Sequence, residues 1–272
     1  MYKEIFENIN SINPIVHCVT NFVTVNDCAN IILACGAAPN MAHDIREVAE
    51  FTSKSNALVL NMGATSDIDA MIIAGKINNE LNHPVIIDPV GIGGSRFRVD
   101  TFQQLSDNIQ FSVIRGNISE IKAIATGKSD IRGVDATEAD KITQENVYEI
   151  ATMAKKLSGK MKSIIIISGP IDIVANQDTA YLVRNGHPIM AKITGSGCMF
   201  TAMLGAFCGG NPDNILEAAL TCTVTMGICG ELAYQKTMAN EGGTMTFRLH
   251  LIDCVSMITP KLICEKAKVE KI

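Results

Sequence analysis

The segment of the chain best suited to chemistry is Thr194-Gly-Ser-Gly-Cys198, which is followed directly by an apolar stretch of helical character. Two glycines free the backbone to turn sharply, so that successive N–H groups can point at one spot. These groups would lie at a helix N-terminus, where the helix dipole also favours negative charge. The pattern predicts an anion hole suited to a phosphoryl group, formed by Gly195, Ser196, Gly197 and Cys198. It is not a Walker A loop, because the GxxxxGK[ST] spacing is absent.

Cys198 would begin this helix with a thiol, and the dipole there favours the thiolate. We therefore expect the pKa of Cys198 to be lower than that of an ordinary cysteine. A nucleophilic cysteine usually works with a histidine, but none of the five histidines stands in a motif relation to Cys198. Two roles stay open for the thiol: a general base, or a group that positions an attacking hydroxyl.

A carboxylate ends the apolar run Pro84–Asp88 and is followed by Pro89. Ligands of open α/β sheets bind beyond the carboxyl ends of the strands. Asp88 is therefore well placed to hold a cation or a phosphate-bound water. A helix cap or a turn aspartate is the structural alternative.

The apolar run FSVIR ends in Arg115, and an arginine at that place is costly unless it meets an anion, for which phosphate is the usual choice. The spacing Asn117-x-x-Glu120 then puts two polar side chains on one side of a first helical turn. This spacing also fits a capping box with Asn117 as the cap. A further run ends in Ser168-Gly169, small residues that let a planar ligand approach the backbone.

These side chains need a scaffold, and the chain supplies short β-branched runs that alternate with helical stretches. The runs lack strict alternation, which fits strands covered on both faces in a parallel sheet. Repeated strand-helix-strand order implies right-handed crossovers and helices on both faces. The expected strands are Asn56–Asn61, Pro84–Asp88, Phe111–Arg115 and Ser163–Ser168, and the expected helices are Asp67–Leu81, Asp100–Asn108, Ser119–Thr126 and Gln144–Leu157.

The alternation of strands and helices ends after the last expected parallel strand. Asp172–Ala175 and Thr179–Val183 predict a short hairpin, and the chain then finishes helical, from Gly197 to about Gly209 and from Asp213 to about Gln235. The predicted fold is an α/β three-layer αβα sandwich, with a mostly parallel central sheet and an antiparallel edge. Because no Pro/Gly/Ser-rich linker interrupts the chain, we expect one domain over residues 1–272.

The bulk composition excludes some classes of protein. A net charge of −5 argues against nucleic-acid binding, which needs clustered Lys and Arg. The N-terminus lacks the order of a signal peptide, and the apolar stretches are too short or too interrupted to span a bilayer. Nine cysteines without a CxxC pair indicate reduced thiols. We therefore expect a cytoplasmic protein that binds neither nucleic acid nor membrane.

The chain resembles the hydroxyethylthiazole kinases of the ribokinase-like superfamily over nearly its whole length. The resemblance rests on motifs that occur in that family in this order and approximate spacing. They are Asp88-Pro-Val-Gly, Arg115-Gly-Asn117-x-x-Glu120 and Thr194-Gly-Ser-Gly-Cys198, together with His17-Cys-Val-Thr20-Asn21-Phe-Val23-Thr24, Ala38-Pro-Asn-Met41 and Asn61-Met-Gly63. Most other ribokinase-like enzymes place aspartate where Cys198 stands. Ser168-Gly-Pro170 departs from the family, in which threonine and an acidic residue are common.

The resemblance implies a phosphotransferase of thiamin salvage, which uses ATP to phosphorylate the primary hydroxyl of 4-methyl-5-(2-hydroxyethyl)thiazole. It also implies a homotrimer with active sites between subunits. Carried over by motif, Asn21, Val23 and Met41 line the thiazole pocket, Gly195 lies beside the substrate hydroxyl, Arg115 and Ser168 contact ATP, and Asp88 and Glu120 organise Mg²⁺.

Three other functions fit the same fold. A kinase for another small alcohol, such as hydroxymethylpyrimidine or pyridoxal, is disfavoured by Cys198 and by the Thr20-Asn21 segment. A catalytically silent nucleotide-binding regulator is disfavoured because the motif residues at the strand ends are intact. A lyase or epimerase would normally show aspartate in place of the cysteine.

Overall fold

A single nine-stranded sheet runs through the computed structural model, which describes residues 1–127 and 142–272. The strands are β1 Ile15–Val19, β2 Ala38–Asn40, β3 Ala57–Asn61, β4 Val85–Asp88, β5 Val113–Asn117, β6 Ile164–Ser168, β7 Asp172–Ala175, β8 Ala180–Val183 and β9 Val269–Lys271. They lie in the order β2-β1-β3-β4-β5-β6-β7-β8-β9. The pairs from β2 to β6 are parallel, and the pairs from β6 to β9 are antiparallel.

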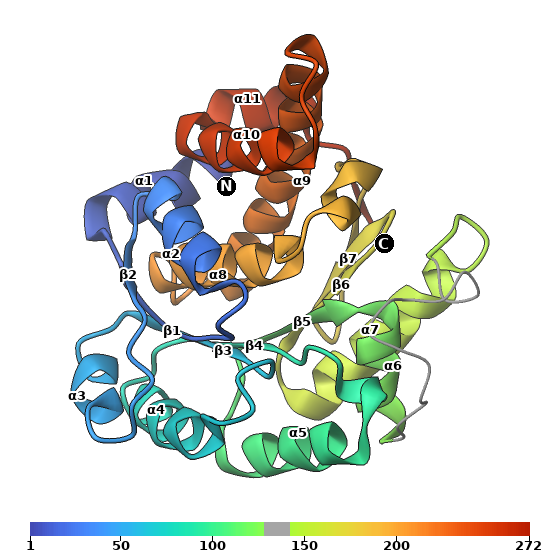
Figure 1. Ribbon diagram of the computed structural model, residues 1–272. Helices are drawn as coiled ribbons and strands as arrows, with labels where there is room; N and C mark the ends of the chain where they lie inside the picture. Colours follow the sequence, from blue (N-terminus) through green and yellow to red (C-terminus); the bar gives the residue numbers. More distant parts are fainter. Residues whose placement is uncertain (128–141) are drawn as a thin grey trace.

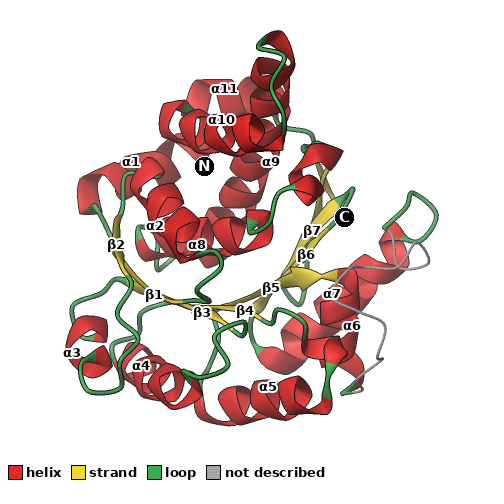
Figure 2. Cartoon of the chain, in the orientation of Figure 1, coloured by secondary structure: helices red, strands yellow, loops and turns green. Residues whose placement is uncertain are grey.

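Helices cover both faces of the sheet, which makes the three layers visible in Figures 1 and 2. On one face are α1 Tyr2–Ile12, α2 Val25–Ala34, α8 Ser196–Gly209, α9 Ile215–Ala239, α10 Thr244–Met257 and α11 Pro260–Lys266. On the other are α3 Val48–Thr52, α4 Ile68–Glu80, α5 Arg96–Asn108, α6 Ile118–Thr126 and α7 Val147–Met161. Short 3₁₀ turns occupy Ile92–Gly94 and Pro188–Lys192. The predicted fold class is confirmed.

The strands are buried on both faces, as their unbroken apolar runs predict. All five residues of β3 are buried. In β6, Ile166 packs into the core on the α8 side, whereas Ile165 and Ile167 pack into the core on the α4–α7 side. Because each face of the sheet meets helices, successive side chains alternate between two apolar cores and need no polar partner.

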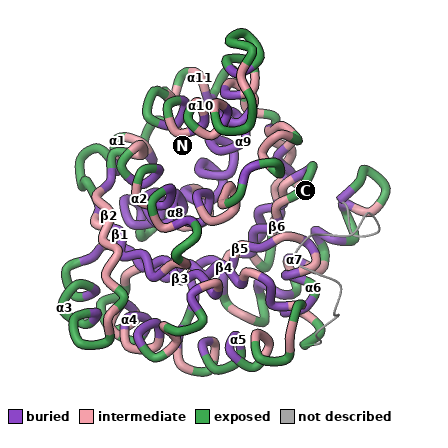
Figure 3. Tube along the Cα trace, in the orientation of Figure 1, coloured by how far each residue is buried: buried purple, intermediate pink, exposed green. Residues whose placement is uncertain are grey.

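Helix α8 is the central element of its layer, and most of its residues are buried (Figure 3). It packs directly on the sheet because Gly205 has no side chain. A Cβ there would lie 2.6 Å from side-chain atoms of both Val16 and Val59. Helix α9 is the one helix of the described residues that is long and apolar enough to cross a membrane. Its most apolar window is 72% buried, however, which fits a core helix.

Most predicted elements occur within a few residues of their expected bounds, and the hairpin of β7 and β8 is confirmed. Strand β1 escaped prediction because His17 interrupts its apolar run. The histidine is fully buried, and its ring nitrogens contact Thr52 Oγ1 at 2.9 Å and the carbonyl of Ala42 at 2.7 Å. The expectation that the chain finishes helical was wrong, since β9 follows α11 and pairs with β8.

Substitution of Gly205 tests how closely α8 must approach the sheet. We expect Gly205→Ala to lower the free energy of unfolding by about 1–3 kcal/mol, because the added methyl overpacks a buried contact. Gly159→Ala in α7 is the matched control. Its Cβ would meet Gln177 at an ordinary 3.5 Å, and helix propensity should stabilise the protein by about 0.5–1 kcal/mol. Urea unfolding measures both, and equal effects would contradict the close approach of α8.

Candidate active site

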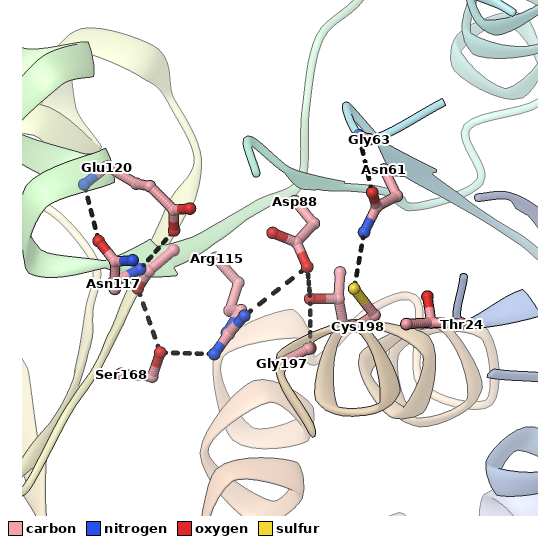
Figure 4. A network of polar contacts seen from close by, with 12 residues as sticks. Thr24, Asn61, Gly63, Asp88, Arg115, Asn117, Glu120, Ser168, Gly197 and Cys198 are labelled. Carbon is pink, nitrogen blue, oxygen red and sulfur yellow. Dashed lines mark hydrogen bonds and ion pairs between the residues drawn. The ribbon is translucent and has the colours of Figure 1, made fainter. Parts of the chain in front are cut away.

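Polar side chains from four parallel strands meet at the carboxyl edge of the sheet, facing the N-terminus of α8 (Figure 4). Asn61, Asp88 and Ser168 are the last residues of β3, β4 and β6, and Arg115 lies near the end of β5. The carboxyl ends of parallel strands lie at one edge, so residues far apart in sequence become neighbours. Six of the predicted site residues gather here: Asp88, Arg115, Ser168 and the Gly195, Gly197 and Cys198 of the helix start.

Arg115 is the only cation of this group, and three partners fix its guanidinium. Its Nη1 lies 3.6 Å from Asp88 Oδ2, and its Nη2 donates to Ser168 Oγ at 2.5 Å. The guanidinium carbon also lies 5.2 Å from the centre of the Phe200 ring. The Arg115 side chain is 11% exposed. A positive charge is therefore held rigidly at the bottom of the site.

The Asp88 carboxylate is 1% exposed. Its Oδ2 accepts a hydrogen bond from Thr201 Oγ1 at 2.8 Å, whereas Oδ1 is buried without a hydrogen-bond partner among the described residues. Burial raises the pKa of Asp88, and the charge of Arg115 and the Thr201 hydroxyl oppose that shift. A carboxylate oxygen that lacks a donor suits a hard cation or a water bound to one.

Glu120 and Asn117 form the capping box that was the structural interpretation of their spacing in the sequence. Its Oε2 accepts from the Asn117 backbone N–H at 2.8 Å, and the Asn117 side chain accepts from the Glu120 N–H at 2.9 Å. Its Oε1 accepts from the Gly91 N–H at 3.0 Å. Burial, with the nearby charge of Asp88, raises the pKa of Glu120 to about 7. The described residues contain no cluster of three or more His, Cys, Asp or Glu side chains able to hold a metal.

The turn before α8 has the backbone expected of an anion hole. Gly195 has φ +84°, in the left-handed region that favours glycine, and the helix begins at Ser196. The first N–H groups of a helix have no intrahelical acceptor, so they are free to bind an anion. A Cβ at Gly197 would lie 2.6 Å from Arg115 Nη1. The guanidinium therefore lies directly against the turn.

Cys198 is half-buried, and its sulfur accepts hydrogen bonds from two amides. Asn61 Nδ2 lies 3.2 Å from the sulfur, and Asn21 Nδ2 lies 3.7 Å from it. Burial raises the pKa of Cys198 to about 11, and the negative charge of Asp88 acts in the same direction. The expectation of a lowered pKa was wrong, because desolvation of the thiolate outweighs the helix dipole. At neutral pH the side chain is a neutral thiol.

The four residues expected at the thiazole pocket lie at the same edge of the sheet. Asn21 lies between β1 and α2, where its Oδ1 accepts from the Val23 N–H at 3.0 Å. The Val23 side chain is 57% exposed. Met41 directly follows β2 and packs against the α8-side core. Gly195 contacts this group through Thr24, because a Cβ on Gly195 would lie 2.6 Å from Thr24 Cγ2.

Three further side chains belong to the site but had no assigned role from sequence. Asn61 ends a buried strand as Asp88 does, so the same strand-end rule could have found it. Thr201 holds Asp88 from one turn inside α8, where a hydroxyl gives no distinctive signal. Thr24 is buried against Gly195 and Cys198, and it stands in a segment quoted above only for its resemblance.

The fold is that of ribokinase-like proteins. A ribokinase-like superfamily protein from Enterococcus faecalis superposes with a TM-score of 0.59 at 12% identity, covering 93% of this chain and 88% of that one. The pyridoxal kinase of Staphylococcus aureus superposes with a TM-score of 0.54 at 13% identity, covering 78% and 84% of the two chains. At such low identity these similarities establish the fold alone.

Sequence similarity narrows the class to one family. The model of the hydroxyethylthiazole kinase family matches residues 6–261. The hydroxyethylthiazole kinase of Clostridium acetobutylicum is 47% identical over 99% of both chains, and that of Methanobrevibacter smithii is 42% identical over 98% of this chain and 95% of that one. The structure of the Pyrococcus horikoshii enzyme has a TM-score of 0.86 at 30% identity, covering 100% and 98%. The chain belongs to the hydroxyethylthiazole kinase family.

The raised pKa of Cys198 predicts how its reactivity depends on pH. Only the thiolate reacts with iodoacetamide, so alkylation of Cys198 should be slow near neutral pH. Its rate should then rise about tenfold per pH unit from about pH 7 to about pH 10. Mass spectrometry of the Cys198 peptide gives the rate, and the exposed Cys264 in the same sample is the control for reagent chemistry. A rate that is already constant above about pH 8 would show a thiolate and contradict the desolvation argument.

Proposed function

We propose that this protein transfers the γ-phosphoryl group of ATP to the primary hydroxyl of 4-methyl-5-(2-hydroxyethyl)thiazole, giving the thiazole phosphate and ADP. One observation carries the proposal. The fixed Arg115 guanidinium lies against the glycine turn of α8, in a chain that is 42–47% identical to relatives named hydroxyethylthiazole kinase. A cation beside the first N–H groups of a helix suits a phosphoryl group during its transfer.

The chemistry asks little more than positioning and charge neutralisation. In a loose phosphoryl-transfer transition state, negative charge spreads over the equatorial oxygens of the moving group. The N–H groups of Gly195 to Cys198 and the Arg115 guanidinium would absorb this charge. Ser168 fixes the guanidinium by its hydrogen bond and would lie against ATP. Loss of one such donor commonly lowers the rate ~10²–10³-fold.

We also propose that Asp88 and Glu120 organise Mg²⁺. The buried Asp88 Oδ1 that lacks a donor supports this role. Both Glu120 oxygens already accept backbone N–H groups, so Glu120 would act on the ion through a bound water. When bound, the ion neutralises charge on the phosphate oxygens. This chain's own contribution is to hold two carboxylates at fixed positions in a dry site.

Cys198 would position the acceptor hydroxyl rather than remove its proton. The thiol is neutral at physiological pH because burial raises its pKa to about 11, and a strong base is not needed when the proton leaves late. Asn21, Val23 and Met41 would line the thiazole side of the pocket, with Gly195 beside the hydroxyl. This arrangement leaves most of the catalysis to the anion hole.

We propose that the protein is a homotrimer whose active sites lie between subunits. Phe22 is 89% exposed and Val23 is 57% exposed on the loop that precedes α2, next to the predicted pocket. Large apolar side chains at such a place favour cover by a second subunit. Sedimentation equilibrium measures the assembly, and a monomeric mass in an active preparation would contradict it. We further propose that residues 1–272 act as one domain in the cytoplasm.

The test of the proposed function is ADP production with ATP, Mg²⁺ and a panel of acceptors. The panel contains hydroxyethylthiazole, hydroxymethylpyrimidine, pyridoxal and a sample without acceptor. Turnover with the thiazole alone is the expected result. Turnover with a different alcohol would keep the phosphate site and reject the pocket assignment. ATP binding without turnover on any acceptor would favour a nucleotide-binding regulator.

Arg115→Ala should raise the KM for ATP by roughly 10- to 100-fold, besides lowering kcat, because it removes a fixed cation that would meet the phosphates both in bound ATP and in the transition state. Initial rates at varied ATP concentration measure the change. The variant also leaves Asp88 buried without its ion-pair partner, which costs about 3–5 kcal/mol, so a thermal melt must show that it is folded. Arg96→Ala, which removes an exposed arginine on α5, is the matched control. An unchanged KM for ATP in a folded Arg115→Ala protein would contradict the assignment.

Cys198→Asp should retain or raise kcat. The surroundings that raise the thiol pKa would also raise that of the introduced carboxylate, but from an ordinary value of about 3.9, which leaves it largely ionised at neutral pH. It could then act as a base, as aspartate does in most ribokinase-like enzymes. Cys198→Ser should stay partly active. Complete loss of turnover in a folded Cys198→Asp protein would show that the cysteine has a role that this account lacks.

A further inference from the structure

Cys198 lies in a closed ring of hydrogen bonds with Asn61 and Asn21, and Thr24 braces Asn21. Asn61 stands at the end of β3, and Asn21 and Thr24 stand in the loop between β1 and α2. We infer that Asn61 and Thr24 are positioning residues: together they hold the sulfur of Cys198 in place beside Gly195, and thereby set where the acceptor hydroxyl lies. This inference deepens the proposed function and rests on it.

The orientation of Asn61 is fixed by its neighbours. The backbone N–H of Gly63 donates to Asn61 Oδ1 at 2.8 Å, and Asn21 Nδ2 donates to the same oxygen at 3.2 Å. Both partners are donors, so this atom of the amide must be the oxygen. The Asn61 NH₂ group must then face the sulfur of Cys198, which lies 3.2 Å away. Asn61 is 1% exposed, and water cannot replace either partner.

Asn21 and Thr24 close the other side of the ring. The Thr24 hydroxyl donates to Asn21 Oδ1 at 3.3 Å, and the Thr24 N–H donates to the same oxygen at 3.2 Å. With its Oδ1 held by these donors, Asn21 directs its Nδ2 to the sulfur of Cys198 at 3.7 Å and to Asn61 Oδ1 at 3.2 Å. The ring therefore joins Asn61 to Cys198, Cys198 to Asn21, and Asn21 back to Asn61, and Thr24 fixes the orientation of Asn21.

The ring lies next to the position where the acceptor hydroxyl would react. Thr24 touches Gly195, since a Cβ on Gly195 would lie only 2.6 Å from Thr24 Cγ2. Gly195 begins the turn whose N–H groups would receive the phosphoryl group. A sulfur that accepts from the amides of Asn61 and Asn21 cannot change rotamer without breaking two bonds. The ring thus couples the thiol position to the anion hole, and pre-organisation of this kind affects kcat more than ATP binding.

A purely structural role for Asn61 makes a different prediction. The Gly63 N–H needs only the oxygen of Asn61, so an amide that merely closed the end of β3 would not depend on Cys198. A double-mutant cycle separates the two roles. Asn61→Ala should lower kcat about tenfold with the KM for ATP unchanged, and it should cost less than about twofold when added to Cys198→Ala. An equal loss in both backgrounds would overturn the inference.

A second measurement does not depend on kinase activity. Asn61→Asp keeps the oxygen that accepts from Gly63 but replaces the donor facing the sulfur with a negatively charged oxygen. Alkylation of Cys198 by iodoacetamide should slow by about tenfold, while the exposed Cys264 reacts as before. An unchanged Cys198 rate would show that the amide does not act on the sulfur, even if the proposed substrate proved wrong.

Controls keep both measurements decisive. Asn78→Ala removes another fully buried asparagine, whose Nδ2 donates to the carbonyl of Pro84 at 3.3 Å far from the ring. It should lower stability without changing Cys198 alkylation. If the Asn61 variants fail to fold, Thr24→Val loosens the other side of the ring, because it removes the hydroxyl that braces Asn21. Its loss of kcat should likewise vanish in the Cys198→Ala background, and a loss that persists there would overturn the inference.

Discussion

The buried ion pair between Arg115 and Asp88 is the interaction on which the site depends. Taking two charges out of water costs several kcal/mol per ion, and their attraction offsets this only when the remaining hydrogen-bonding groups are satisfied. Ser168 and Thr201 supply two of those partners, whereas Asp88 Oδ1 and Arg115 Nε are buried without one among the described residues. Strands β4, β5 and β6 and helix α8 must therefore keep their relative positions. The tight packing of α8 on β1 and β3 at Gly205 follows from the same need.

Burial makes negative charge costly at two groups of the site. It raises the pKa of Glu120 to about 7 and that of Cys198 to about 11, so both resist carrying negative charge. Arg115 supplies the fixed positive charge of the site. An incoming polyphosphate thus meets a fixed cation, helix N–H groups and few competing anions. The dry site that costs stability in the free protein favours the binding of a charged substrate.

Helix α8 links the phosphate side of the site to the acceptor side. Gly197 lies against Arg115, and Gly195 lies against Thr24. Because Gly195 and Gly197 have no side chains, the start of α8 contacts both the phosphate side and the acceptor side of the site. Side chains at either position would push the guanidinium or the threonine away. The hydrogen-bonded ring around Cys198 then extends this contact to the end of β3.

The sequence by itself determined the alternating α/β order, the polar strand ends at Asp88, Arg115 and Ser168, and the glycine turn, because these depend on local patterns of burial and backbone freedom. It missed β1, where a buried histidine broke the apolar run, the three-residue β2, and β9, whose pairing with β8 joins distant segments. Only the tertiary structure decided the state of Cys198. A helix start favours thiolate, but desolvation is set by neighbours that the sequence does not place together. The ring through Asn61 likewise exists only because folding brings three separate loops to one edge of the sheet.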